Sequence, residues 1–209
     1  MNMKTLFLIL TVLTTYSHGE YTTTCERKVD VSQDRMNEVV NMFFNDMQTD
    51  INGLFKWAFK GTENDKKDST RNTIQIKYKE SYAEPERHYG KQVIDVIVPH
   101  FKTFKDISIE SSYTDTTLED RMRAIHLTID YSGSLLKDAS ADFNTIPITD
   151  NSSYAQLTIR IKFGFFFNLF ISRKMYINVI EWRINQMFEN LCEMAEKGEV
   201  TVESLSEVQ

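Results

Sequence analysis

The clearest pattern in the chain is a set of apolar residues that recurs at steps of three and four between residues 32 and 61. This spacing places the side chains on one face of an α-helix. Ser32 is suited to cap the helix N-terminus, and Gly61 is suited to end the helix. We therefore predict one long helix from Ser32 to Gly61. Its apolar face comprises Met36, Val40, Phe43, Met47, Ile51, Leu54 and Ala58.

Between residues 73 and 167 the apolar period changes to two, which is typical of strands with one buried face. The strongest alternation runs over 157–165, and weaker ones run over 74–78, 107–113 and 125–131. An apolar run before residue 99 is interrupted only by Asp95 and fits a strand inside a sheet. Because no helical run separates these segments, we predict an antiparallel sheet of about five or six strands.

A second long helix is predicted over 173–197, between Ser172 and Gly198 as its caps. Three further apolar residues, Met175, Val179 and Trp182, lie off its apolar face. Trp182 points roughly 160 to 200° away from the stripe at 100° per residue. We expect these three residues to form a patch for a protein partner. The apolar face itself comprises Ile177, Ile180, Ile184, Met187, Leu191 and Met194.

A short strand over 26–31, a helix, a meander of strands and a long C-terminal helix follow one another in an order that resembles the helix-grip fold. START-type lipid carriers and the polyketide cyclase group belong to that family. The resemblance rests on element order and on the last strand–helix unit, 157–196. It implies an α+β fold in which a curved antiparallel sheet wraps the last helix, with a ligand cavity between them. The long first helix departs from the family, which usually has shorter helices there, and such a helix would fill the concave face.

The densest apolar feature is the aromatic run between residues 163 and 170. One interpretation is plain core where the last strand meets the last helix. The other is the lining of an apolar cavity of about 300 Å³ or more. In that case the inward residues Tyr113, Tyr131, Phe163 and Phe165 would face the ligand.

The first nineteen residues predict a cleavable secretory signal. Lys4 provides a positive start, residues 6–13 are mostly apolar, and Ser17 and Gly19 offer small side chains at the cleavage site. The apolar run is far shorter than the roughly 20 residues that cross a bilayer, so we expect no transmembrane helix. We expect cleavage after Gly19, a single domain over 20–198, and a short, acidic, mobile tail over 199–209.

The formal net charge of the chain is −6, and no block of basic residues stands out. Nucleic-acid binding needs clustered Lys and Arg to neutralise phosphates, so no nucleic-acid partner is expected. The same balance argues against binding to anionic lipid surfaces. Such a leader followed by a compact domain is similar to exported proteins of Gram-negative bacteria, and we expect a periplasmic or secreted location.

Two cysteines are present, Cys25 and Cys192. In an oxidising compartment they are candidates for a disulfide between the N-terminus and the last helix. The alternative is two separate thiols, one buried in the helix and one loose near the N-terminus.

No motif that carries recognisable chemistry is present. His88, His100 and His126 lack partners at metal-ligand spacing, and no nucleophile elbow or phosphate-binding glycine loop occurs. The carboxylates around Pro85 are interpreted as a polar hairpin connection. We therefore name no catalytic residue, metal or cofactor. Two hypotheses remain: an exported, non-enzymatic binding protein for an apolar or lipid-like ligand, or an envelope interaction or structural component. An enzyme is a third interpretation, for which no nucleophile, metal or acid–base pair can be named.

Overall fold

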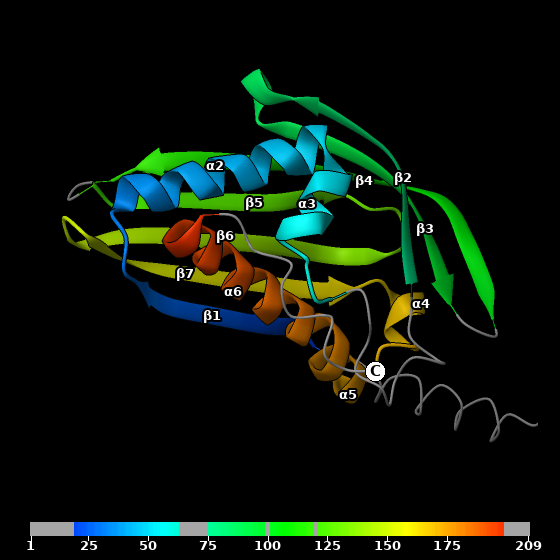
Figure 1. Cartoon of the computed structure of the whole chain (residues 1–209). Helices are drawn as coiled ribbons and strands as arrows, with labels where there is room; N and C mark the ends of the chain where they lie inside the picture. Colours follow the sequence, from blue (N-terminus) through cyan, green and yellow to red (C-terminus); the bar gives the residue numbers. More distant parts are fainter. Residues whose placement is uncertain (1–18, 63–74, 99–100, 119–120, 199–209) are drawn as a thin grey trace, which may run out of the picture.

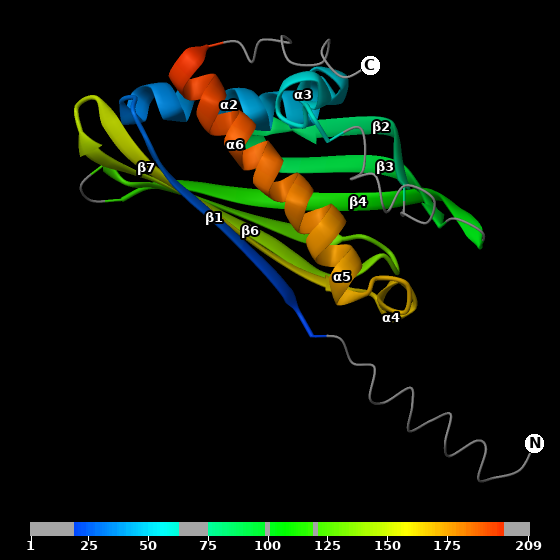
Figure 2. The ribbon, with the colours of Figure 1, turned by 60° about the horizontal axis from the view of Figure 1, so that its bottom comes forward.

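The computed structural model describes residues 19–62, 75–98, 101–118 and 121–198. The described residues form a seven-stranded antiparallel sheet in the order β1-β7-β6-β5-β4-β3-β2, with helices across one curved face (Figures 1 and 2). The predicted α+β class and antiparallel sheet are confirmed. The strands are β1 (Tyr21–Val29), β2 (Gln75–Glu84), β3 (Tyr89–Val98), β4 (Lys102–Thr117), β5 (Arg123–Tyr131), β6 (Leu136–Thr149) and β7 (Ser152–Phe163).

The strand that the sequence pattern missed is β6. Its buried positions include Ala139, Phe143 and Thr145, of which only Phe143 is large and apolar. Thr145 is fully buried, and its hydroxyl is satisfied by donating to Oδ1 of Asn37 on the first helix, at 3.0 Å. Small and polar inward residues therefore hide the period of two that marks the other strands.

The predicted single N-terminal helix is wrong, because the chain forms two helices, α2 (Gln33–Thr49) and α3 (Ile51–Trp57). Asp50 leaves the helical conformation and its carboxylate accepts a hydrogen bond from the backbone N–H of Gly53, at 2.9 Å. A side chain that caps a new N-terminus in this way competes with helix continuation. The side chain of Ile51, one of the predicted apolar residues, lies outside the described part.

The C-terminal helix begins where predicted but is not regular. Ser172 caps α5 (Arg173–Met175), a π-helical turn (Tyr176–Glu181) follows, and α6 (Trp182–Lys197) completes the run. A π-turn contains more residues per turn than an α-helix, which shifts the phase of the side chains before it. Ile177, predicted in the core, is therefore exposed, whereas Val179 is buried at 3% exposure.

The last strand is shorter than predicted because Gly164 ends it. A β-carbon at Gly164 would lie 2.0 Å from the carbonyl oxygen of Ser134, so only glycine fits this close approach. The backbone N–H of Gly164 donates to the carbonyl of Leu135, at 2.9 Å. The chain then turns into the short helix α4 (Phe165–Asn168), which removes Phe165 from the sheet.

Two apolar clusters form the core on the concave face. The larger one joins α2, α3 and α6 to β1, β6 and β7, and contains fully buried residues such as Met36, Phe188 and Cys192. The smaller one joins β3 to α4 and the β5–β6 turn around Ile94, Val96 and Phe167. Figure 2 shows α6 crossing the face diagonally, with α2 and α3 over only one part of it.

No helix in the described ranges is long and apolar enough to span a membrane. The expected signal segment up to residue 18 and the tail over 199–209 lie outside these ranges, as do Ile74 and His100.

Candidate ligand cavity

A cavity of about 240 Å³, smaller than the roughly 300 Å³ or more expected for a ligand carrier, lies between the first turns of the C-terminal helix and the concave face of the sheet. Its walls come from β2, β3, β4 and β7, from the β5–β6 turn, from α4, and from the π-turn and α6. None of the lining residues comes from α2 or α3, within the part of the chain that the structure describes. The lining residues are Ile76, Tyr78, Ile94, Val96, Ile109, Leu135, Leu136, Ile161, Phe163, Phe167, Ile171, Met175, Val179, Ile180 and Arg183.

Among these described lining residues, only Tyr78 and Arg183 end in polar atoms. Burial raises the pKa of the Tyr78 phenol, and the nearby positive charge of Arg183 opposes part of that rise. The phenol is therefore a neutral hydrogen-bond donor at physiological pH, next to a permanently charged guanidinium. One wall of an otherwise apolar cavity thus carries a donor and a positive charge.

Sequence reasoning missed both polar residues, although Arg183 left a signal. It lies three residues after Ile180 and four before Met187, so a charged residue interrupts the apolar face of the last helix. A charge at such a position must find a partner or a polar cavity wall. Tyr78 alternates with its neighbours as a core strand residue would, and nothing in the sequence distinguishes it.

Of the four residues predicted to face a ligand, the structure places only Phe163 at the cavity. Tyr113 stacks on Phe44 of α2, with ring centroids 5.0 Å apart, and belongs to the larger cluster. Tyr131 is 55% exposed at the end of β5, and Phe165 is 70% exposed. The prediction for Phe165 is wrong because the strand ends at Gly164, so the alternation of inward and outward side chains does not continue to Phe165.

The predicted interaction patch is not an outer surface. Met175 and Val179 both line the cavity, because the π-turn rotates them toward the sheet. Trp182 is half-buried. Met175 and Val179 are therefore part of the cavity wall. The three residues share no exposed face on which a protein partner could dock.

The two cysteines are both buried and free, so the expected disulfide is not formed in this structure. Cys25 is not loose near the terminus but lies in β1, where its thiol donates to Oδ1 of Asn185 at 3.1 Å. Burial raises the pKa of the Cys25 thiol to about 11 and that of Cys192 to about 12. Both groups are therefore protonated at neutral pH and poor nucleophiles.

The described histidines have structural partners. His88 stacks on Tyr113 with ring centroids 4.5 Å apart. On the outer face of the sheet, Nδ1 of His126 lies 2.6 Å from Oδ1 of Asp142, and Arg160 pairs with the same carboxylate. Burial alone would raise the pKa of Asp142, but hydrogen bonds from Arg160 and His126 lower it. Within the described ranges, no group of three or more potential metal ligands occurs.

The carboxylates around Pro85 form the expected polar hairpin connection. A short 3₁₀ turn (Pro85–Arg87) joins β2 to β3, and Arg87 pairs with Glu84 at 2.8 Å. Glu86 is exposed. This arrangement gives the connection a local ion pair and no buried carboxylate for acid–base chemistry.

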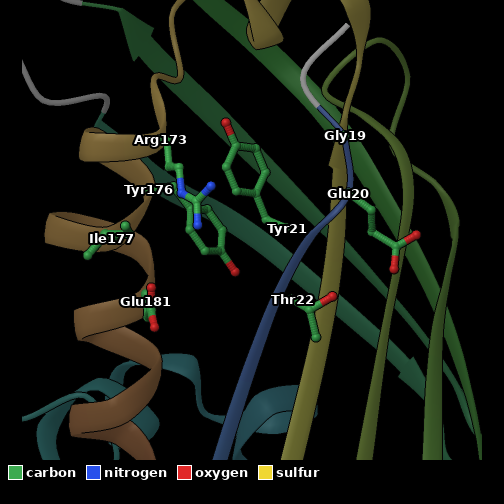
Figure 3. Close-up of a pocket in the computed structure, with 8 residues that line it drawn as sticks. All are labelled: Gly19, Glu20, Tyr21, Thr22, Arg173, Tyr176, Ile177 and Glu181. Atoms are coloured by element: carbon green, nitrogen blue, oxygen red, sulfur yellow. The ribbon is translucent and has the colours of Figure 1, made fainter.

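A second, polar pocket of about 440 Å³ opens between the start of β1 and the C-terminal helix (Figure 3). Figure 3 shows Tyr21, Tyr176 and Arg173 gathered there, with Glu20 pointing to the other side of β1. The two tyrosine rings stack 4.2 Å apart, and both hydroxyls have partners, the Ile171 carbonyl and Thr23. The pair therefore fastens β1 to the helix, and Tyr21 also packs edge-on against the cavity residue Phe163.

No protein-family model matches the sequence, and no curated protein matches it. Solved structures with a similar fold include a protein of Thermus thermophilus, 11% identical over 84% of this chain and 97% of that chain, TM-score 0.48. An aromatase/cyclase of a Streptomyces species is 14% identical over 85% and 94%, TM-score 0.47. A START superfamily protein from Mycobacterium smegmatis is 10% identical over 85% and 98%, TM-score 0.46.

At these identities and scores, the likenesses carry no inference about activity or ligand. The helix-grip architecture expected from the order of elements is present in the structure itself. Its antiparallel sheet curves around the C-terminal helix (Figure 2). The cavity lies between the two.

Proposed function

We propose that this protein binds a small apolar molecule in the cavity between the sheet and the C-terminal helix, and that it holds the molecule without transforming it. The observation that carries the proposal is the lining, which is apolar except for Tyr78 and Arg183. Ligand sites in proteins are typically apolar clefts in which a few polar groups fix the orientation.

The volume limits the ligand. A cavity of about 240 Å³ lies below the roughly 300 Å³ at which sites for drug-sized molecules begin. A water molecule takes about 30 Å³ of the liquid, and a methylene group is of similar size. The cavity therefore has room for roughly eight such groups, which favours a medium-length chain or a small ring system over a whole membrane lipid.

The two polar residues favour an anionic or hydrogen-bond-accepting head group. The positive charge of Arg183 lies near the neutral Tyr78 phenol at this wall of the cavity, and it would attract an anionic head group. We therefore expect a medium-chain carboxylate to bind more tightly than the alcohol of the same chain length.

Isothermal titration with octanoate, decanoate and decanol tests the proposal. Val179→Phe places a ring in the cavity, whereas Ile177→Phe makes the same kind of change on the exposed side of the same turn. Decanoate should bind the unmodified protein and the Ile177 variant but lose at least tenfold in affinity for the Val179 variant. Arg183→Met should weaken decanoate binding and leave decanol binding unchanged.

Two results would overturn the proposal. One is the absence of saturable binding of all three compounds to the folded, unmodified protein. The other is unchanged affinity in Val179→Phe, which would place the binding site elsewhere. Circular dichroism of each variant separates lost binding from lost folding.

We also propose that the protein is exported and that its leader is removed after Gly19. This proposal is supported by the leader sequence and by the position of β1, which begins at Tyr21, so cleavage would leave the sheet intact. N-terminal sequencing of the protein recovered outside the cytoplasm should begin at Glu20. Recovery of the protein only with Met1 in place would contradict the proposal.

A further inference from the structure

One end of the sheet presents a cluster of apolar side chains, which we call the aromatic tip: the exposed Phe101, Phe165 and Leu169 and the half-buried Phe166 and Phe170. Phe101 is 58% exposed, Phe165 70% and Leu169 48%. Contacts of the Phe101 ring with Phe166 and Phe170, at centroid distances of 5.6 and 5.3 Å, join the start of β4 to α4. Figure 1 shows α4 beside this end of β3 and β4. The exposed Phe101 therefore packs on two half-buried rings whose chain neighbours Phe165 and Leu169 are exposed, and such clusters mark interaction sites.

The charge around the tip differs from that of the whole protein. The segments 101–105 and 162–175 contain five basic residues and no acidic one, in a chain of net charge −6, although Asp138 is in register with Lys162, and Glu20 and Glu181 line the same pocket as Arg173. The basic residues are Lys102, Lys105, Lys162, Arg173 and Lys174. Lys102, Arg173 and Lys174 are exposed, and Lys102 lies over the Phe104 ring at 5.3 Å. The carboxylate of Asp106, just beyond the first segment, is already paired with Lys79 at 2.7 Å.

We propose that the aromatic tip docks on the surface of an anionic lipid bilayer. Exposed Phe and Leu side chains gain free energy by entering the headgroup and acyl boundary, and nearby Lys and Arg are attracted by anionic headgroups. The expectation drawn from net charge is revised here, because salt screens charges over about 8 Å and the surface responds to local charge.

The tip is continuous with the cavity wall. Phe104 packs against Phe167 with centroids 5.0 Å apart, and Phe167 and Ile171 line the cavity. A bilayer that contacts the tip would therefore lie against α4, and α4 would separate the bilayer from the cavity. Docking depends only on the exposed residues, however, and does not require the ligand proposal to be correct.

Flotation with vesicles tests docking on the full protein. We expect binding to vesicles of phosphatidylcholine with about 30% phosphatidylglycerol and weak binding to pure phosphatidylcholine, with affinity falling as salt rises. The triple variant Lys102→Gln, Arg173→Gln and Lys174→Gln should lose roughly 100-fold in affinity. The triple variant Phe101→Ser, Phe165→Ser and Leu169→Ser should also lose at least tenfold.

Matched controls carry the same types of change at exposed positions elsewhere. Tyr82→Ser with Ile148→Ser controls for lost apolar surface, and Lys28→Gln with Lys197→Gln controls for lost charge. Both controls should bind anionic vesicles as the unmodified protein does. Titration of the tip variants with decanoate separates the docking proposal from the ligand proposal. A variant that loses vesicle binding but keeps its affinity for decanoate is altered at the tip alone.

Three results would overturn the docking proposal: no vesicle binding by the unmodified protein, equal binding to neutral and anionic vesicles, or equal loss in the control variants. A concentration-dependent dimer that disappears in the aromatic triple variant would also overturn it, since a second copy of the chain would then cover the tip.

Discussion

The two ends of the concave face share one sheet and one C-terminal helix, yet one end is filled and the other is hollow. At the filled end, α2 and α6 both cover the sheet, and residues such as Phe188 and Cys192 are fully buried. At the cavity end, the helical residues that line the cavity come from α4, α5, the π-turn and the start of α6, and no described residue of α2 or α3 takes part. The difference teaches that the cavity follows from uneven helix coverage. The same kinds of apolar side chain line both ends.

The largest expected difference between the two ends is in the stability lost when a phenylalanine is replaced by alanine. Phe188→Ala at the filled end should lower the free energy of unfolding by about 3–5 kcal/mol, because a void replaces well-packed neighbours. Phe163→Ala at the cavity end should cost clearly less, since part of that ring already faces empty space. Urea unfolding of both variants measures the contrast. Equal losses would mean that the cavity end is packed as tightly as the filled end.

A smaller effect is expected from added volume. Cys192→Leu adds atoms where there is no room and should cost about 1–3 kcal/mol. Val179→Leu adds a methylene group next to the cavity and should cost less than about 1 kcal/mol. Thermal unfolding followed by circular dichroism compares the two. A loss of stability in Val179→Leu as large as that in Cys192→Leu would contradict the presence of empty space beside Val179.

The smallest effect concerns pH and Asp95, the polar residue in the apolar run of β3. The register of β3 and β4 shifts at Asp95, where β4 carries one extra residue. The Asp95 carboxylate accepts the backbone N–H of Asp106 and pairs with Lys79, both at 2.9 Å. The Asp106 hydrogen bond and then Lys79 lower the pKa of Asp95 below its ordinary value. The charged carboxylate therefore stabilises the fold above its unfolded pKa, and this contribution is lost as pH falls through its folded pKa.

Asp95→Asn should accordingly lower the free energy of unfolding at pH 7, with a difference that shrinks between roughly pH 5 and pH 2. Urea unfolding across this range provides the measurement. Asp138→Asn, at an exposed position of β6, serves as the control. A difference that stays constant with pH would show that Asp95 acts through packing and not through its charge.

Local patterning predicted much of the fold. The spacing of Met36, Val40 and Leu54 identified residues that are buried on the N-terminal helices, and Ser172 and Gly198 bounded the C-terminal run. The break at Asp50 was missed because the apolar stripe stays in phase across it. A capping side chain can interrupt the backbone without disturbing the period of the side chains.

The site was predicted less well, since its residues depend on contacts between distant segments. Phe163, which was expected to face a ligand, lines the cavity. Phe165 was misplaced because the close approach of Gly164 to Ser134, thirty positions earlier, ends the strand. Val179 was misplaced because the π-turn, which periodic reasoning does not anticipate, changes the facing of the residues before α6.

The sequence by itself determined the α+β class, the antiparallel sheet and the long C-terminal helix, because the periods of hydrophobic residues are local properties of helices and strands. Only the tertiary structure decided where the helices stop covering the sheet, and therefore that a cavity exists and that Tyr78 and Arg183 share its wall. It also placed Phe101, next to Lys102, against Phe166 at one end of the sheet. Both outcomes depend on how residues far apart in the chain meet, which no local period records.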